Sequence, residues 1–181
     1  DTLFLDIETT GLSLYYDIIT MIGWSIGPHY QVLISGQDET AFKAALAKAK
    51  VIVTFNGTQF DLKFIEKAWP GLRFPPVHVD LRYLAKRSGL SGGQKAIEKQ
   101  IGYKRNKQVK EMLGEAAPIL WHRYRRGDIK ALKRLITYNH EDIEGMKCIF
   151  DYCVTRITEQ EAIPSEIAPA LKFTKSRSRI E

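Results

Sequence analysis

The sequence predicts one α/β domain in which a mixed five-stranded sheet is flanked by helices. The chain has 181 residues, a length that suits a single domain with a full hydrophobic core. Short apolar runs typical of strands prevail up to about residue 80, and amphipathic helical patterns prevail after it. The resulting order, β-β-β-α-β-α-β followed by helices, favours three antiparallel strands and then parallel ones.

Five segments have the composition of strands. The turn-like residues Thr9-Thr10-Gly11 end the first segment, and Gly27-Pro28 joins the second to the third as a hairpin. The fourth is a short β-branched run, as expected for a central strand, and the last is expected at the edge of the sheet. The expected strands cover residues 2–8, 18–26, 30–34, 51–55 and 77–79.

Helices are expected between and after these strands. Asp38 and Asp128 are placed to cap the first and the last helix, and the second helix stops before Pro70. Residues 1–158 would form the folded domain, and residues 159–181, which end in a stretch rich in Lys, Arg and Ser, would form a docked or flexible C-terminal tail. The expected helices cover residues 38–50, 59–68, 80–87, 93–101, 117–126 and 128–158.

The net charge of +6 is unevenly distributed along the chain. Residues 82–134 contain 15 Lys and Arg against 4 Asp and Glu, a net charge of +11, whereas the rest carries 12 against 17, a net charge of −5. This asymmetry suits a protein that handles a polyanion such as nucleic acid beside a cation-binding centre. The alternative interpretation is an ordinary solvated helical surface.

Composition favours a cytoplasmic location. No apolar run approaches the roughly 20 residues of a membrane span, so we expect no membrane association. Cys148 and Cys153 have neither a metal-binding spacing nor the pattern of a disulfide framework, which is typical of a reducing compartment. The chain does not begin with Met, so we expect a trimmed chain or a part of a longer protein.

The first strand carries two acids within an apolar pattern. In FLDIETTG, residues 4–11, Asp6 and Glu8 are two positions apart and therefore point to the same face of the strand. Buried strands rarely hold two like charges on one face, because desolvation and repulsion are costly unless a cation joins them. A functional site is therefore the favoured interpretation of this pair.

Two further segments hold candidate site residues. Asp61 follows the strand at 51–55 and lies at a helix start, and Tyr138 and Asp142 are four residues apart on one face of the last helix. Singly, each has an ordinary interpretation. Asp61 would be a first-turn acid favoured by the helix dipole, Asp142 an exposed helical acid, and Tyr138 a core aromatic.

Together, the four acids indicate a metal site. Strand ends and helix starts at one edge of an α/β sheet are where ligands gather, so the acids are expected to converge there. Carboxylate oxygens suit Mg²⁺ or Mn²⁺, and the lack of sulfur and imidazole in the set argues against zinc. Two such ions would neutralise the acids and clamp the attacking and leaving oxygens of a phosphodiester.

These residues resemble the motifs of the DnaQ-like 3′–5′ exonuclease superfamily, which is named DEDD for its four acids. The three matching motifs are Asp6-x-Glu8, Asn56-x-x-x-Phe60-Asp61 and Tyr138-x-x-x-Asp142. The third motif is that of the tyrosine (DEDDy) subgroup. The histidine subgroup would need a His five residues before the last acid, where this chain has Thr137, and His140 is at a different position.

The middle of the chain is similar to the YprB-like branch, a family of predicted exonucleases with the RNase H-like fold. The resemblance covers about residues 1–155 and implies that fold. The segments that carry it are Val79-Asp-Leu81, Gly92-Gly-Gln-Lys-Ala-Ile-Glu98 and Trp121-His-Arg-Tyr-Arg-Arg-Gly-Asp128.

The resemblance implies a role for each catalytic residue. Asp6, Glu8 and Asp142 would bind the more tightly held metal ion, with Asp6 bridging to a second ion that Asp61 supports through water. Tyr138 would orient the attacking water, since a phenol with a pKa of about 10 is a poor base. The implied reaction is hydrolysis at the 3′ end of single-stranded DNA or RNA, with DNA slightly favoured, to release nucleoside 5′-monophosphates.

The resemblance also implies contacts with the substrate. Thr10, Gly11 and Leu12 would lie beside the terminal nucleotide, and Asn56 and Phe60 would help hold the scissile end. Basic residues are candidates for binding the backbone of the strand, with a merely solvated surface as the alternative. These basic candidates are Lys95, Lys99, Lys104, Arg105, Arg123, Arg125 and Arg126.

Other functions stay open at this point. Asp6-Ile-Glu8-Thr-Thr10 approaches the D-x-D-x-T motif of haloacid-dehalogenase-like phosphatases, although that mechanism has no use for the third motif. A structure-selective endonuclease and a non-catalytic nucleic-acid-binding module would use the same fold. A place in a longer chain or in a repair or processing complex fits each of the nucleic-acid functions.

Overall fold

The structure is a computed structural model that describes residues 1–160, so most of the expected tail lies outside the described residues. Its five-stranded sheet has the order β3-β2-β1-β4-β5. β1, β2 and β3 are antiparallel neighbours, and β4 and β5 run parallel to β1. This confirms the predicted mixed sheet. The strands are β1 (Thr2–Thr9), β2 (Ile19–Ile26), β3 (His29–Ile34), β4 (Val51–Thr54) and β5 (Val77–Asp80).

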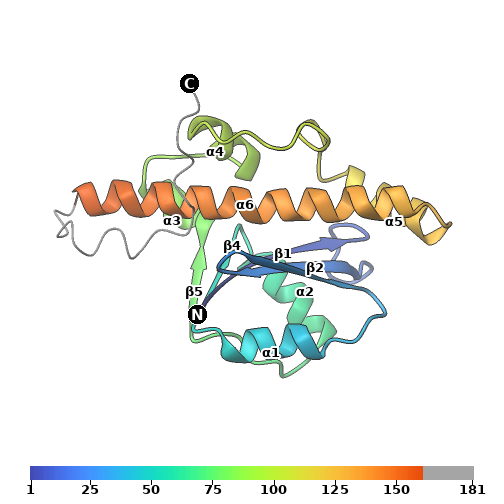
Figure 1. The fold of residues 1–181 in the computed structure, drawn as a ribbon. Helices are drawn as coiled ribbons and strands as arrows, with labels where there is room; N and C mark the ends of the chain where they lie inside the picture. Colours follow the sequence, from blue (N-terminus) through green and yellow to red (C-terminus); the bar gives the residue numbers. More distant parts are fainter. Residues whose placement is uncertain (161–181) are drawn as a thin grey trace.

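Helices cover both faces of the sheet (Figure 1). The long helix α6 crosses one face, with α3, α4 and α5 packed against it, and α1 and α2 lie on the opposite face. The helices are α1 (Thr40–Lys48), α2 (Asp61–Ala68), α3 (Leu81–Arg87), α4 (Gln94–Gln100), α5 (Ala116–Arg125) and α6 (Ile129–Gln160). None of these helices is both long enough and apolar enough to span a membrane.

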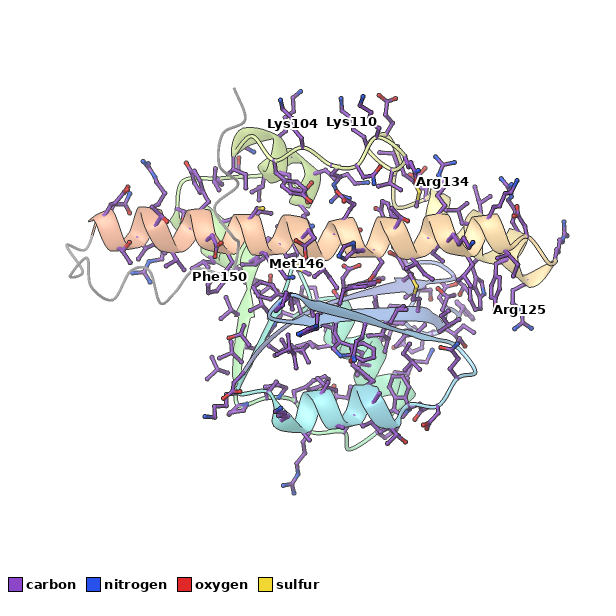
Figure 2. All side chains as sticks on the ribbon, viewed as in Figure 1. Lys104, Lys110, Arg125, Arg134, Met146 and Phe150 are labelled. Carbon is purple, nitrogen blue, oxygen red and sulfur yellow. The ribbon has the colours of Figure 1, made fainter. Side chains whose placement is uncertain are left out.

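The central strand β1 is buried on both faces, and its alternation divides the core. Leu3, Leu5 and Ile7 pack with residues of α1 and α2. Phe4 points to the other face, where it packs with Met146 of α6. Figure 2 shows Met146 on the side of α6 that faces the sheet. Because successive side chains alternate, the two acids of β1 belong to the face that α6 covers.

The helix ends largely follow the predicted signals. The Asp128 carboxylate accepts hydrogen bonds from the N–H groups of Lys130 and Ala131, at 3.0 and 3.1 Å, which confirms it as the cap of α6. Asp38 is not the capping position of α1, because the N-cap is Glu39. The Asp38 carboxylate instead accepts from the N–H and the hydroxyl of Thr40, so it still satisfies one donor at the helix start.

α6 approaches β2 closely at Gly23. A β-carbon at this position would lie 1.7 Å from Oδ1 of Asn139, a distance that no structure tolerates without movement. Gly23 is also the β2 residue paired with Asp6 of β1. The glycine therefore makes the room in which an α6 side chain reaches the acids of the neighbouring strand.

We expect Gly23→Ala to lower the free energy of unfolding by about 1–3 kcal/mol, because the added methyl overpacks this contact. Denaturant unfolding measures the change. Gly114→Ala is the matched control, since a β-carbon there meets open space and Gly114 has no positive φ. Equal stabilities of the two variants would contradict the close contact.

Candidate active site

Three carboxylates converge between β1 and α6. Asp6, Glu8 and Asp142 each offer an oxygen, and these oxygens all lie within 4.8 Å of one another. Glu8 and Asp142 are buried, at 7% and 8% exposure. The expected same-face arrangement of Asp6 and Glu8 places both acids opposite the middle of α6, where Asp142 meets them.

Asp61 lies at the edge of the same region, at the first position of α2. Its Oδ1 accepts a hydrogen bond of 3.2 Å from the N–H of Ile7, the residue between the two acids of β1. This N–H is accessible because β4 pairs with β1 only along Thr2, Leu3 and Phe4. Asp61 is outside the group of three oxygens described above, although it is buried at 4% exposure.

Asn139 holds the two acids of β1. Its Nδ2 donates to Asp6 Oδ2 at 2.8 Å and, more weakly, to Glu8 Oε1 at 3.4 Å. Its Oδ1 accepts from the hydroxyl of Tyr30 at 3.0 Å, which fixes the orientation of the amide. Because one donor group serves both carboxylates, Asn139 keeps like charges side by side.

Arg105 holds the third acid. Its Nε and Nη2 donate to the two oxygens of Glu98 at 2.6 and 2.7 Å, and Nη2 also donates to Asp142 Oδ1 at 2.5 Å. The guanidinium is buried, and its Nη1 has no hydrogen-bond partner among the described residues. The side-on pair with Glu98 fixes the plane of the guanidinium beside Asp142.

Tyr138 lies one helical turn before Asp142, as its spacing predicted. Lys95 Nζ donates to its hydroxyl oxygen at 3.0 Å and lies 4.6 Å from the ring centre. The same ammonium donates to the carbonyl of Met112, which anchors it. Burial and the nearby acids raise the pKa of Tyr138 above its ordinary value, so the phenol keeps its proton at neutral pH.

Burial dominates the electrostatics of the four acids. It raises the pKa of Asp61 to about 7 and that of Asp142 to about 6, although Arg105 opposes the shift at Asp142. Burial, followed by the charge of Asp142, also raises the pKa values of Asp6 and Glu8 well above their ordinary range. The Arg105 guanidinium and the Lys95 ammonium are therefore too little positive charge for four ionised carboxylates in this place.

The donor set fits a hard divalent cation. The three convergent side chains offer only carboxylate oxygens, which suit Mg²⁺ or Mn²⁺. The nearby His140 is not part of the group; its ring packs against that of Tyr30 at a tilt of 52°, and its Nε2 lies 3.8 Å from Oε1 of Glu144. A cation bound by Asp6, Glu8 and Asp142 would relieve the electrostatic cost described above.

The expected contacts with a terminal nucleotide fall on a structured turn. Thr10 Oγ1 donates to Asp17 Oδ1 at 2.8 Å, and the Ser13 N–H donates to Asp17 Oδ2 at 2.8 Å. A β-carbon at Gly11 would lie 2.6 Å from the Asp17 carboxylate, so the glycine admits that carboxylate. Leu12 is 85% exposed. These placements are compatible with substrate binding, which stays a prediction.

The second motif is shaped by Asp80. Its Oδ1 accepts from the N–H of Asn56 at 2.8 Å, and its Oδ2 accepts from the N–H of Thr58 at 3.1 Å. Asn56 has a positive φ of 63°, and its side-chain oxygen accepts from Arg82 at 2.8 Å. Phe60 packs against Phe64 with ring centres 4.8 Å apart and ring planes tilted by 50°. Asp80 thus bends the loop that delivers Asp61 to β1.

The basic candidates separate into two groups. Lys95 and Arg105 lie at the acids, and the burial of Arg105 does not fit the surface role expected for it. Arg123 is exposed and forms an ion pair with Asp128, with Nη2 and Oδ2 at 2.7 Å. Figure 2 shows Lys104 on the side of α6 that faces away from the sheet, and Arg125 near the N-terminal end of that helix. Binding of the strand by these surface residues stays a prediction.

A model of the RNase H superfamily matches residues 3–154. The chain belongs to the RNase H superfamily. This membership fits the observed sheet order and argues against the haloacid-dehalogenase-like alternative, while the YprB-like branch stays a prediction. No curated protein matches the sequence significantly.

Solved structures share the fold at low sequence identity. The family B DNA polymerase of Pyrobaculum calidifontis superposes with a TM-score of 0.66 and 15% identity over 93% of this chain, which spans 27% of the polymerase chain. Brucella melitensis NrnC superposes with a TM-score of 0.63 and 19% sequence identity, over 96% of this chain and 81% of the NrnC chain. Escherichia coli RNase D, an exoribonuclease involved in structured RNA processing, superposes with a TM-score of 0.63 and 18% sequence identity. The match covers 93% of this chain and 43% of the RNase D chain.

Several residues of the site had not been expected from the sequence. Asn139 directly follows Tyr138, and its polar side chain on a buried helix face was the available signal. Glu98 was visible as an acid next to apolar Ile97, and Gly145 as a glycine inside a long helix. None of these signals identifies its partner, because the partners come from other elements.

In EDTA, we expect the free energy of unfolding to fall as pH rises from about 4 to about 7. The pKa values of Asp61 and Asp142 in the folded chain, about 7 and about 6, exceed the value of about 3.9 for unfolded Asp. The folded state therefore binds more protons over this interval, and raising the pH favours unfolding. Denaturant titrations at pH 5 and pH 7.5 measure the effect.

Asp61→Asn is the control for this pH dependence. It removes one titrating group, so the variant should lose less stability between the two pH values than wild type, by about 1 kcal/mol or more. Mn²⁺ should stabilise wild type more at pH 7.5 than at pH 5, because it binds ionised carboxylates. Parallel profiles for wild type and Asp61→Asn would contradict the raised pKa of Asp61.

Proposed function

We propose that this chain is a divalent-metal-dependent 3′–5′ exonuclease. Its substrate would be single-stranded DNA or RNA, with DNA slightly favoured, and its products nucleoside 5′-monophosphates. The observation that carries the proposal is the convergence of Asp6, Glu8 and Asp142 with Tyr138 one turn away. The fold shared with an exoribonuclease, RNase D, supports a nuclease rather than a binding module.

The chain's own residues would prepare the site for hydrolysis. Asp6, Glu8 and Asp142 would hold the metal, and Asp61 would support a second ion. When bound, the ions supply an acidified water and neutralise charge at the phosphate. Tyr138, whose phenol keeps its proton at neutral pH, would position the attacking water by hydrogen bonding instead of removing its proton.

A cavity beside the second motif supports a polyanionic substrate. It has a volume of about 700 Å³, enough for a nucleotide, and Phe55, Asn56, Arg82 and Lys86 contribute to its lining. The two cations suit phosphate groups, and the aromatic ring suits a base. A strand whose end reaches the acids would have room to continue past the second motif into this cavity.

The decisive experiment is digestion of end-labelled single-stranded and duplex DNA and RNA, with Mg²⁺, Mn²⁺ or EDTA. We expect a ladder of products shortened from the 3′ end of the single strands, and no cleavage in EDTA. One internal cut would instead identify an endonuclease, and intact strands in every metal would overturn the proposed activity.

Asp6→Ala should reduce this cleavage more than about 100-fold. Loss of a residue that merely orients a metal ligand costs about 10- to 100-fold, and this variant removes an expected ligand itself. Glu66→Ala is the matched control, since Glu66 is an exposed acid on α2. Circular dichroism should show both variants folded. Cleavage by Asp6→Ala at the wild-type rate would show that the site is wrongly assigned.

A further inference from the structure

The turn after the first motif exposes three large apolar side chains within five residues. Leu12 is 85% exposed, Tyr15 87% and Tyr16 91%. A single exposed apolar residue is ordinary, but a cluster of them marks an interaction site. Two adjacent tyrosines also bring flat aromatic rings that the core does not use.

This turn is held in place, even though its side chains are exposed. Lys67 of α2 donates from one ammonium to the carbonyl oxygens of Leu14, Asp17 and Tyr15, at 2.5, 3.1 and 3.3 Å. The Tyr16 N–H donates to the Ser13 hydroxyl at 3.3 Å. Because the backbone of the turn is already fixed, binding through the rings would carry no further cost for ordering that backbone.

The turn also lies next to the acids. The N–H of Thr10 donates to the carbonyl of Ile18 at 3.0 Å, so the turn closes two residues beyond Glu8. Asp17, which bonds to Thr10, is two residues from Tyr15, so their Cα atoms are at most about 7 Å apart. The rings are therefore carried by the turn that directly follows the first acid motif.

We propose that Tyr15 and Tyr16, which adjoin the expected contact at Leu12, form a stacking platform for nucleobases of the bound strand. This rests on the proposed function, since it takes single-stranded nucleic acid as the ligand. Residues 9–18 contain no Lys or Arg, so the turn itself has no cation with which to select phosphate. An aromatic face stacks on any base, which suits a nuclease that must accept every sequence.

The test is binding of a single-stranded oligonucleotide that carries 2-aminopurine near its 3′ end, with Ca²⁺ in place of Mg²⁺ and the strand checked to be intact. We expect Tyr15→Ala/Tyr16→Ala to weaken binding by about tenfold or more, in fluorescence anisotropy, and to relieve the quenching that stacking causes. Tyr15→Phe/Tyr16→Phe should stay within about twofold of wild type, because the rings remain. Ile119→Ala, at a residue 62% exposed on α5, is the control.

The outcomes separate the platform from the catalytic proposal. Wild-type affinity and quenching in the double alanine variant would overturn the platform alone. Weakened binding in that variant, together with no cleavage by wild type in any metal, would keep the platform and overturn the nuclease. Absence of oligonucleotide binding by wild type would overturn both and leave the turn as a surface for a protein.

A different observation concerns Glu98 and Arg105. A β-carbon at Gly145, one turn after Asp142, would lie 2.0 Å from Glu98 Oε1, so α6 carries a glycine where Glu98 enters. A glycine inside a helix is unfavourable, and a buried ion pair adds little net stability, so stability alone explains this arrangement poorly. Glu98 is outside the group of acids that could share a metal.

We infer that Arg105, fixed by Glu98, is a positioning residue for Asp142. The guanidinium engages Asp142 Oδ1, which leaves Oδ2 as the oxygen for the metal ion. Fixing one oxygen in this way would set the orientation of the carboxylate before the metal arrives. The inference rests on the proposed role of Asp142 as a metal ligand.

The test is the affinity for Mn²⁺, measured without substrate from the electron paramagnetic resonance signal of the unbound ion. Arg105→Lys keeps the charge but loses the fork, and Glu98→Gln removes the fixing carboxylate. Each should weaken Mn²⁺ binding by about 10- to 100-fold. Thermal unfolding in EDTA shows which variants are folded. If only one of Arg105→Lys and Glu98→Gln folds, its Mn²⁺ affinity alone decides the test.

Unchanged or tighter Mn²⁺ binding in a folded variant would overturn the inference, since tighter binding would make Arg105 a mere competitor of the metal. Absence of Mn²⁺ binding by wild type would overturn it as well. Weaker binding in the variants, with a wild type that cleaves no nucleic acid, would keep the positioning role and overturn the nuclease.

Discussion

The burial of like charges in the centre of the sheet is the constraint on which the rest of the site depends. β1 is the middle strand, so Asp6 and Glu8 face the covering helix, where Glu8 is buried and Asp6 is half-buried. Burial and mutual repulsion both favour protonation of these acids, and ionised acids need positive charge or hydrogen-bond donors nearby. Asn139 supplies the donor, and the metal of the proposed function would supply most of the charge.

The long helix α6 links this constraint to the hydrophobic core. It contributes Tyr138, Asn139 and Asp142 to the site, and Met146 and Ile149 to the core around Phe4. Because one rigid helix carries both the site residues and the core residues, the packing of its core residues against the sheet also fixes how close its site residues come to β1. The close approach at Gly23 sets the distance between the two elements. The positions of the site residues on α6 are therefore fixed by the same packing that forms the core around Phe4.

The positive segment of the chain has two structural uses. Lys95 and Arg105 turn inward, where they partly balance the acids and hold Tyr138 and Asp142. Other cations, such as Lys104 and Arg125, lie on the outer surface (Figure 2). The positive segment, which suggested either a surface for a polyanion or an ordinary solvated surface, thus also contains the internal counter-charge of the site. Lys95 and Glu98 are three residues apart on α4, and Tyr138 and Asp142 are four apart on α6, so each pair lies on one face of its helix.

The sequence by itself determined the elements and picked out Asp6, Glu8 and Asp142, although it also predicted Asp61 in the group, which the structure places at its edge. Alternation with a period of two placed Asp6 and Glu8 on one face, and a spacing of four placed Tyr138 above Asp142, because both periodicities are properties of the local backbone. Tertiary structure alone decided which side chains control these acids. Asn139 reaches Asp6 across 133 residues, and Arg105 reaches Asp142 across 37. Such contacts depend on how separate elements pack, which no local pattern records.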